Sequence, residues 1–150
     1  FDMRWVAKAE LFEPPVVGWA MKWGGDIPLR RGTGESVRAM MSECERSLAA
    51  GISVMMFPEG TRSKTGELRD FKTGAFQLAR EARVPVVPIV IRGTSDALPK
   101  RGFVLQGRHR ISVTVLPAVD EAVVESLSTD ELTAHVRELI ASELTVPAAP

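Results

Sequence analysis

The sequence predicts an α/β fold, a mixed sheet flanked by helices, on three observations. Short apolar runs at residues 52–57 and 86–91 have the length of buried strands. The segments at residues 34–50 and 73–83 instead place apolar side chains at helical spacing. With 45% hydrophobic and 25% charged residues, the 150-residue chain has the composition of a globular domain with one sizeable core. Such alternation favours a layered sheet with its binding site at the carboxyl ends of the strands.

The first two elements are a short strand at residues 4–8 and a helix at residues 16–23, which follows two prolines. The helix has little polar face except Lys22. Two interpretations stay open for its tryptophans, Trp19 and Trp23. They either pack in a core or lie at a membrane interface, which suits an apolar ring with one polar atom.

A longer amphipathic helix at residues 34–50 ends at Gly51, a common C-terminal stop. Cys44 lies in its apolar row, together with Val37, Met40, Met41 and Leu48. We therefore expect Cys44 to be a core residue and not a nucleophile, and a single cysteine excludes an internal disulfide. The strand at residues 52–57 follows and breaks at Pro58 into a polar turn.

The second half continues with a helix at residues 73–83, which ends before a Val-Pro pair. Residues 86–91 form a strand that its flanking and internal prolines confine to a sheet margin or a bulge. Residues 111–115 alternate apolar and polar side chains, as in a half-exposed strand. Ser128 and Glu131 form a capping box that begins the last helix.

The turn after the second expected strand, residues 52–57, carries the most chemistry. Its sequence, FPEGTRS at residues 57–63, holds a carboxylate, a glycine, a hydroxyl and a guanidinium in four consecutive residues. Arg62 offers a planar set of donors that fits a phosphate, and Gly60 lets backbone N–H groups approach the same anion. An ordinary polar loop with an internal Glu59–Arg62 ion pair is the competing interpretation.

This turn resembles the third motif of the glycerolipid acyltransferases, a family that includes the 1-acyl-sn-glycerol-3-phosphate acyltransferases. Further segments are similar to motifs of the same family in the same order: VAKAELF at residues 6–12, GDIPLRRG at 25–32, FKTG at 71–74 and VPVVPI at 84–89. The resemblance covers roughly residues 5–117. It implies the family's fold in a partial, N-terminally truncated domain at residues 1–146, and residues 147–150 are expected to be a disordered tail.

Two departures from the family pattern affect the expected site. The family's first motif, N-H-x4-D, supplies the catalytic His and Asp, and the sequence lacks it. His109 and His135 are followed five positions on by Thr114 and Ile140, where the motif needs Asp. We therefore expect no catalytic residue among these residues and interpret the chain as a fragment. In the second motif, Arg30 stands at the place of the usual Asp.

The resemblance implies transfer of a fatty acyl group from a thioester to the free hydroxyl of lysophosphatidate, giving phosphatidate. The donor would be acyl-CoA or acyl carrier protein, with no bound cofactor and no metal. The expected substrate-binding residues are Arg31, Glu59, Gly60, Thr61, Arg62 and Lys72. Two other functions stay open: a non-catalytic module that binds lipid phosphate, and an acyltransferase for glycerol-3-phosphate or a lyso-ornithine lipid.

Composition sets further limits on partners. Nineteen basic and nineteen acidic residues cancel, which argues against a general nucleic-acid binder. No segment has the roughly 18 consecutive apolar residues of a bilayer span. The family resemblance nevertheless implies a membrane surface as a partner, on the cytoplasmic side. The basic stretch at residues 99–110 either attracts anionic lipid or coenzyme A phosphates, or is a solvated loop.

Overall fold

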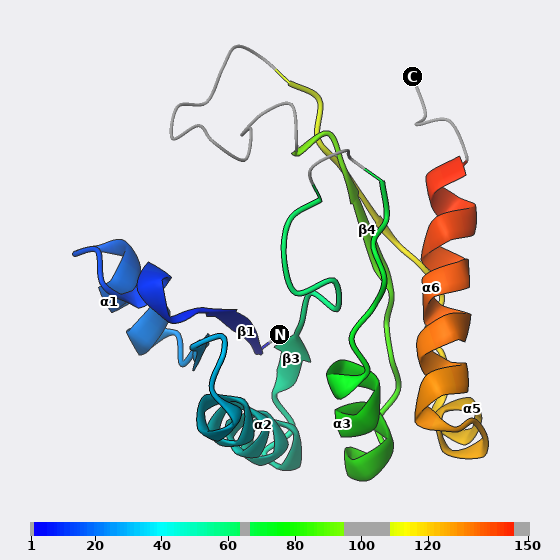
Figure 1. The fold of residues 1–150 in the computed structure, drawn as a ribbon, viewed down its shortest axis with the longest axis horizontal. Coiled ribbons are helices and arrows are strands. Elements are labelled where there is room, and N and C mark those ends of the chain that lie inside the picture. Colours follow the sequence, from blue (N-terminus) through cyan, green and yellow to red (C-terminus); the bar gives the residue numbers. More distant parts are fainter. Residues whose placement is uncertain (1, 64–66, 95–108, 146–150) are drawn as a thin grey trace. The chain divides into compact units, whose positions relative to one another are not determined.

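The computed structural model describes residues 2–63, 67–94 and 109–145. Helices and strands alternate along these residues (Figure 1), as an α/β fold requires. The chain divides into two compact units, Phe1–Phe57 (the N-terminal unit) and Pro58–Pro150 (the C-terminal unit). The single domain expected over residues 1–146 stays a prediction, and the expected tail lies outside the described residues.

The N-terminal unit is built on a parallel sheet with strand order β2-β1-β3. Its strands are β1 (Met3–Lys8), β2 (Ile27–Leu29) and β3 (Ser53–Met55). The first half of β1 pairs with β3 and the second half with β2, where Val6 lies opposite Ile27 and Lys8 opposite Leu29. Just before β2 begins, the Asp26 carboxylate accepts the Trp5 N–H at 2.9 Å, so it continues the β2 side of the ladder by one residue. All three carboxyl ends therefore lie at the same edge of the sheet.

Three helices complete this unit: the 3-10 turn η1 (Ala9–Phe12), α1 (Val17–Trp23) and α2 (Gly34–Ala49). The helix α2 packs on β2 and β3. Cys44 is fully buried there, which confirms its core position, and burial raises its pKa to about 11. The prediction for Val37 is wrong, because this residue of the first turn is exposed and the buried row starts one turn later at Met40.

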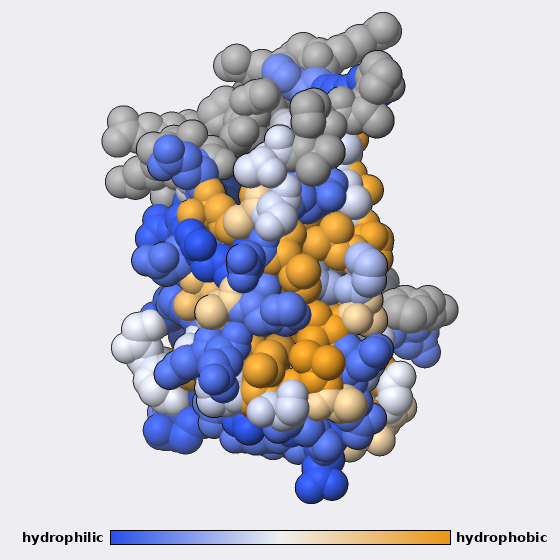
Figure 2. All heavy atoms as spheres, turned by 90° about the vertical axis from the view of Figure 1, so that its right-hand side faces the viewer, coloured by the Kyte–Doolittle hydropathy of each residue, from blue (hydrophilic) through white to orange (hydrophobic). Residues whose placement is uncertain are grey.

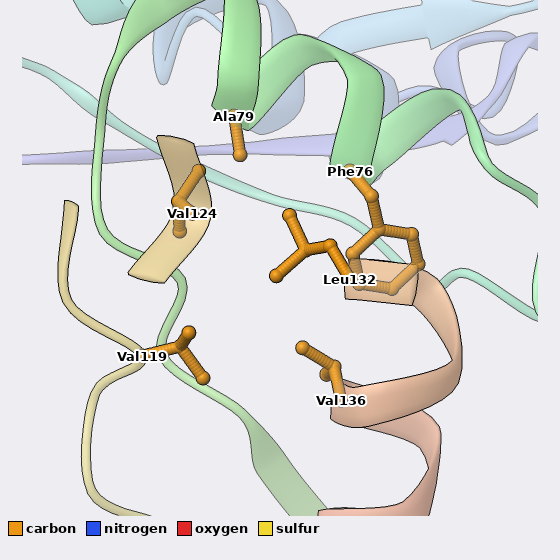
Figure 3. Close-up of a cluster of buried hydrophobic side chains, with 6 residues drawn as sticks. All are labelled: Phe76, Ala79, Val119, Val124, Leu132 and Val136. Carbon is orange, nitrogen blue, oxygen red and sulfur yellow. The ribbon is translucent and has the colours of Figure 1, made fainter. Parts of the chain in front are cut away.

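The C-terminal unit has an antiparallel pair of strands, β4 (Ile89–Arg92) and β5 (Ser112–Val115). Its helices are α3 (Gly74–Ala82), α5 (Glu121–Ser126) and α6 (Thr129–Thr145). The core draws on all three helices (Figure 3), with Phe76 and Ala79 from α3, Val124 from α5, Leu132 and Val136 from α6, and Val119 before α5. Each fully buried side chain of this kind stabilises the unit by about 1.5–3 kcal/mol.

The strand expected at residues 86–91 is only half correct. β4 starts at Ile89, while Val86 makes a separate bridge to Val119 through two hydrogen bonds of 3.0 and 2.8 Å. Pro88 stands between the two pairings and has no N–H to donate, so the ladder is interrupted there.

A shallow apolar groove of about 470 Å³ runs beside α6. Leu116, Val123 and Leu139 line it together with polar residues that include His135 and Glu143. Figure 2 faces the α6 side and shows hydrophobic surface between hydrophilic margins. Among the described residues, no helix is both long and apolar enough to cross a membrane.

Candidate functional site

The residues of the FPEGTRS turn lie in a loop whose shape depends on a second loop ten residues downstream. The Lys72 N–H donates to the Pro58 carbonyl at 2.9 Å. The Arg69 N–H donates to the Glu59 carboxylate at 3.0 Å. One hydrogen bond therefore joins the FPEGTRS motif to FKTG, and the other joins it to Arg69, two residues before FKTG begins.

Gly60 allows Lys72 to cross this surface. Its φ is +65°, a left-handed backbone conformation that favours glycine. A Cβ atom at this position would lie 3.0 Å from Lys72 Cε and 3.3 Å from Lys72 Nζ. The ammonium group of Lys72 is thus held over the turn, close to its backbone, although the side chain is exposed on its outer side.

Helix α6 supports the second loop through hydrogen bonds from one arginine. Arg137 donates from Nε to the Arg69 carbonyl at 3.2 Å and from its terminal nitrogen to the Leu68 carbonyl at 3.4 Å. A chain of hydrogen bonds therefore runs from α6 through residues 68–69 to the Glu59 carboxylate. Sequence reasoning missed Arg137, and no motif marks it because it acts through backbone carbonyls.

Thr61 and Arg62 complete the turn in the C-terminal unit. Thr61 is half-buried and Arg62 is exposed. The structure thus brings five of the six expected binding residues together in one pair of loops: Glu59, Gly60, Thr61, Arg62 and Lys72. The cations Arg62 and Lys72 and the glycine backbone form an arrangement that can hold an anion.

Arg31 belongs to the N-terminal unit, in the turn between β2 and α2. This turn is fixed by a hydrogen bond of 2.9 Å from the Arg30 N–H to Ser36 Oγ, and by Gly32 with φ at +95°. Both arginines are exposed. That Arg31 shares one site with Arg62 stays a prediction.

Lys8 is a further cation that sequence reasoning did not select. It is the last residue of β1, is exposed, and pairs in register with Leu29, the residue just before Arg30. The carboxyl edge of the parallel sheet therefore carries Lys8 together with the arginine turn. The signal was present, because Lys8 is the one basic residue of the VAKAELF segment.

The two histidines occupy different surroundings. His109 is exposed, as expected, and His135 is half-buried on α6 in the apolar groove. Within the described ranges, no three His, Cys, Asp or Glu residues are grouped as a metal ion would need.

The glycine turn of the C-terminal unit carries two cations, and the N-terminal unit is built on a parallel sheet with helices. The family model described as Acyltransferase matches residues 2–92. The chain belongs to the acyltransferase family.

Named relatives agree with this assignment. The chain is 40% identical over 112 residues to the chloroplastic 1-acyl-sn-glycerol-3-phosphate acyltransferase of Brassica napus, covering 73% of this chain and 33% of that protein. It is 34% identical over 142 residues to the alpha form of 1-acyl-sn-glycerol-3-phosphate acyltransferase of Mus musculus, covering 94% of this chain and 49% of the mouse protein. The chain therefore spans between a third and a half of these two relatives.

A solved structure supports the fold. The crystal structure of the 1-acyl-sn-glycerophosphate acyltransferase PlsC from Thermotoga maritima aligns with a TM-score of 0.83 and 28% identity. The alignment covers 99% of this chain and 59% of the other. The predicted acyltransferase-like α/β fold is confirmed.

Proposed function

We propose that the whole protein transfers a fatty acyl group from an acyl thioester to the free hydroxyl of lysophosphatidate, giving phosphatidate. The observation that carries this proposal is the joined pair of loops in which Lys72 lies over Gly60, two residues before the exposed Arg62. The relatives named above are enzymes of that activity. The acceptor's phosphate is the dianion that this cationic surface would hold.

Each loop residue has a separate part in the proposed site. Arg62 binds two phosphate oxygens through its planar guanidinium, and Lys72 adds a compact positive charge. The backbone around Gly60 and the Thr61 hydroxyl donate further hydrogen bonds. Glu59 keeps the loop in shape through the Arg69 N–H. Arg31 grips the same phosphate from the β2–α2 turn.

The chemical step itself needs a group that we place outside these 150 residues. A general base removes the proton from the acceptor hydroxyl as its oxygen attacks the thioester carbonyl carbon. The new ester bond forms, the C–S bond breaks, and the proton ends on the departing thiol. The transfer uses no metal and no redox cofactor. The binding loop contributes by fixing the position of the acceptor hydroxyl relative to the thioester carbonyl.

The donor and the location belong to the same proposal. The thioester is carried by coenzyme A or acyl carrier protein, and the reaction takes place at the cytoplasmic face of a membrane because the acceptor and the product are lipids. Assays of the full-length protein with each donor in turn distinguish the two carriers.

The test is a panel of acceptors with the purified full-length protein. Lysophosphatidate, glycerol-3-phosphate and a lyso-ornithine lipid are each supplied with acyl-CoA or acyl carrier protein, and products are identified by mass spectrometry. We expect phosphatidate as the main product. Faster acylation of either other acceptor would reassign the substrate. Saturable lysophosphatidate binding without any product would instead support a non-catalytic phosphate-binding module.

A further inference from the structure

The surface around α1 has no part in the phosphate site, yet it carries most of the large hydrophobic side chains that are exposed in the described part of the N-terminal unit. Its exposed side chains, which we call the tryptophan surface, are Leu11, Val16, Val17, Trp19 and Trp23. Trp23 is 87% exposed and Trp19 is 56% exposed. Large apolar groups gathered in this way mark a place of contact with another molecule or with a membrane.

Gly18 holds the two tryptophans in a fixed orientation. It is buried, and a Cβ atom there would lie 2.2 Å from the Phe12 carbonyl oxygen, so the backbone of α1 packs directly on η1. Trp19 and Trp23 are four residues apart and point from the same side of the helix. Figure 1 shows α1 beyond the carboxyl end of β1. The rings are therefore presented outward from a firmly packed support.

The charges around the tryptophan surface are mixed, because Lys22 lies on α1 while Glu10 and Glu13 are exposed on either side of Leu11. Lys22 is the only ionisable side chain between Pro14 and Gly25, and it is exposed. An indole has an apolar body and one N–H donor, which suits the region between lipid headgroups and acyl chains. A lysine beside it extends its ammonium group toward anionic headgroups. The tryptophan surface thus complements a bilayer in polarity, and Lys22, the only ionisable side chain on α1, complements anionic headgroups.

A second copy of the chain fits this surface poorly. A tryptophan buries at most about 150–250 Å². Two of them supply roughly 300–500 Å², and even with the partly exposed Leu11, Val16 and Val17 added, the surface does not exceed the roughly 800 Å² that a stable interface needs from each partner. Insertion into a bilayer has no such threshold, because every apolar group that leaves water contributes by itself.

We propose that the tryptophan surface is a membrane contact, in which Trp19 and Trp23 enter the headgroup region of an anionic bilayer. The inference rests on the proposed function, which supplies an acceptor that resides in a membrane. A seven-residue helix lies on the bilayer and does not span it. From Trp23 the chain continues through β2 directly to the Arg31 turn, so this contact would bring the phosphate-binding turn to headgroup level.

The direct test places a fluorescent probe on the surface. Trp23→Cys in the full-length protein is labelled with an environment-sensitive dye, and Ala39→Cys, exposed on α2, is the matched control. Cys44 stays unlabelled because it is buried and its pKa is raised to about 11, which leaves almost no thiolate at neutral pH. Any cysteines beyond these 150 residues are replaced. The vesicles contain phosphatidylcholine and phosphatidylglycerol, and sedimentation reports binding.

We expect vesicles to shift the emission of the probe at position 23 to shorter wavelength and to protect it from a water-soluble quencher, without changing the probe at position 39. The proposal is overturned if the protein does not sediment with vesicles, or if the bound protein leaves position 23 as accessible as in solution. Protection already complete without vesicles would also overturn it, because another protein segment would then cover the surface.

A second measurement separates this inference from the proposed activity. Replacement of both Trp19 and Trp23 by Ala should lower transfer to long-chain lysophosphatidate in vesicles at least roughly tenfold. The reason is that the variant lacks both indole rings, whose apolar surface would otherwise leave water when the protein binds the membrane. Transfer to a soluble short-chain lysophosphatidate should not change, and Val37→Ala should affect neither. Equal effects on both acceptors would reject the membrane contact. No turnover by the unchanged protein on either acceptor would reject the activity alone, and the probe experiment would still decide the contact.

Discussion

At the scale of single residues, the charged side chains of the binding turn have two different roles. The Glu59 carboxylate accepts a backbone N–H from Arg69, so its first role is to shape the loop. Lys72 is held over Gly60, and its charge is therefore placed by the backbone conformation of another residue. Arg62 is exposed and carries the planar donor set that a phosphate requires. We therefore assign recognition to Arg62 and Lys72, and positioning to Glu59.

Replacement of Arg62 tests this assignment. A hydrogen bond to a charged group contributes about 1.5–3 kcal/mol. Arg62→Ala in the full-length enzyme should therefore raise the KM for the acceptor by roughly 10- to 200-fold, while the KM for the donor stays nearly constant. Arg62→Lys should restore part of the loss, because a point charge does not reproduce two parallel donors. An unchanged acceptor KM with a lower melting temperature would show that Arg62 is structural.

At the scale of elements, α6 begins with a reciprocal cap that sequence reasoning identified correctly. The Ser128 N–H donates to the Glu131 carboxylate at 2.8 Å, and the Glu131 N–H donates to Ser128 Oγ at 3.3 Å. Hydrogen bonding of the Glu131 carboxylate to the Ser128 side chain, and to the Ser128 backbone N–H, lowers the pKa of Glu131 from its ordinary value of 4.5. Because α6 also carries Arg137, the cap supports the helix that holds the second binding loop.

The cap gives stability a defined pH dependence. Because the pKa of Glu131 is lower in the folded state, its contribution is complete above pH 4.5 and is lost as the pH falls through the folded value. Ser128→Ala should cost about 1 kcal/mol of unfolding free energy at neutral pH. Chemical denaturation of this variant and the unchanged protein at pH 7 and at acidic pH should show the difference shrinking as Glu131 is protonated. A difference that is the same at every pH would contradict the role of the carboxylate.

The sequence predicted most elements, because long amphipathic helices and apolar strands carry a repeating pattern. The elements that it missed are short and have no such repeat, namely Ala9–Phe12, Ile27–Leu29 and Glu121–Ser126. Ile27–Leu29 contains a proline and becomes a strand because β1 offers it a pairing partner, and the bond from the Trp5 N–H to the Asp26 carboxylate holds the preceding residue against β1. The site was predicted from motif chemistry, whereas Arg137 and the crossing of Lys72 over Gly60 depend on contacts between distant parts of the chain.

At the scale of the whole molecule, one phosphate bound by both Arg31 and Arg62 stays a prediction. Arg31 comes from the N-terminal unit and Arg62 from the C-terminal unit, so a double-mutant cycle tests whether both bind the same phosphate. If they do, the effects of Arg31→Ala and Arg62→Ala on acceptor binding should differ from additivity by about 0.5–3 kcal/mol. Binding measured by calorimetry for both single variants and the double variant gives this coupling. Additive effects would place the two arginines in separate sites.

We expect the general base of the proposed reaction to lie outside these 150 residues. The attack of a hydroxyl on a thioester needs a group placed to take the proton, and a family member uses the His of N-H-x4-D for this purpose, a motif absent from these 150 residues. The isolated chain should therefore show no transferase activity in an assay of thiol release from acyl-CoA, even where circular dichroism shows that it is folded. A longer form that includes the upstream motif should be active.

A variant of the longer form serves as the control for this outcome. Replacing the His of the upstream motif by Ala in the longer form should abolish turnover and leave lysophosphatidate binding unchanged, because the phosphate loops are intact. Turnover by the isolated chain would place the base within it. His135, half-buried on α6, would then be the first residue to replace, and exposed His109 the second. Loss of that turnover in His135→Ala would move the catalytic centre to the C-terminal unit.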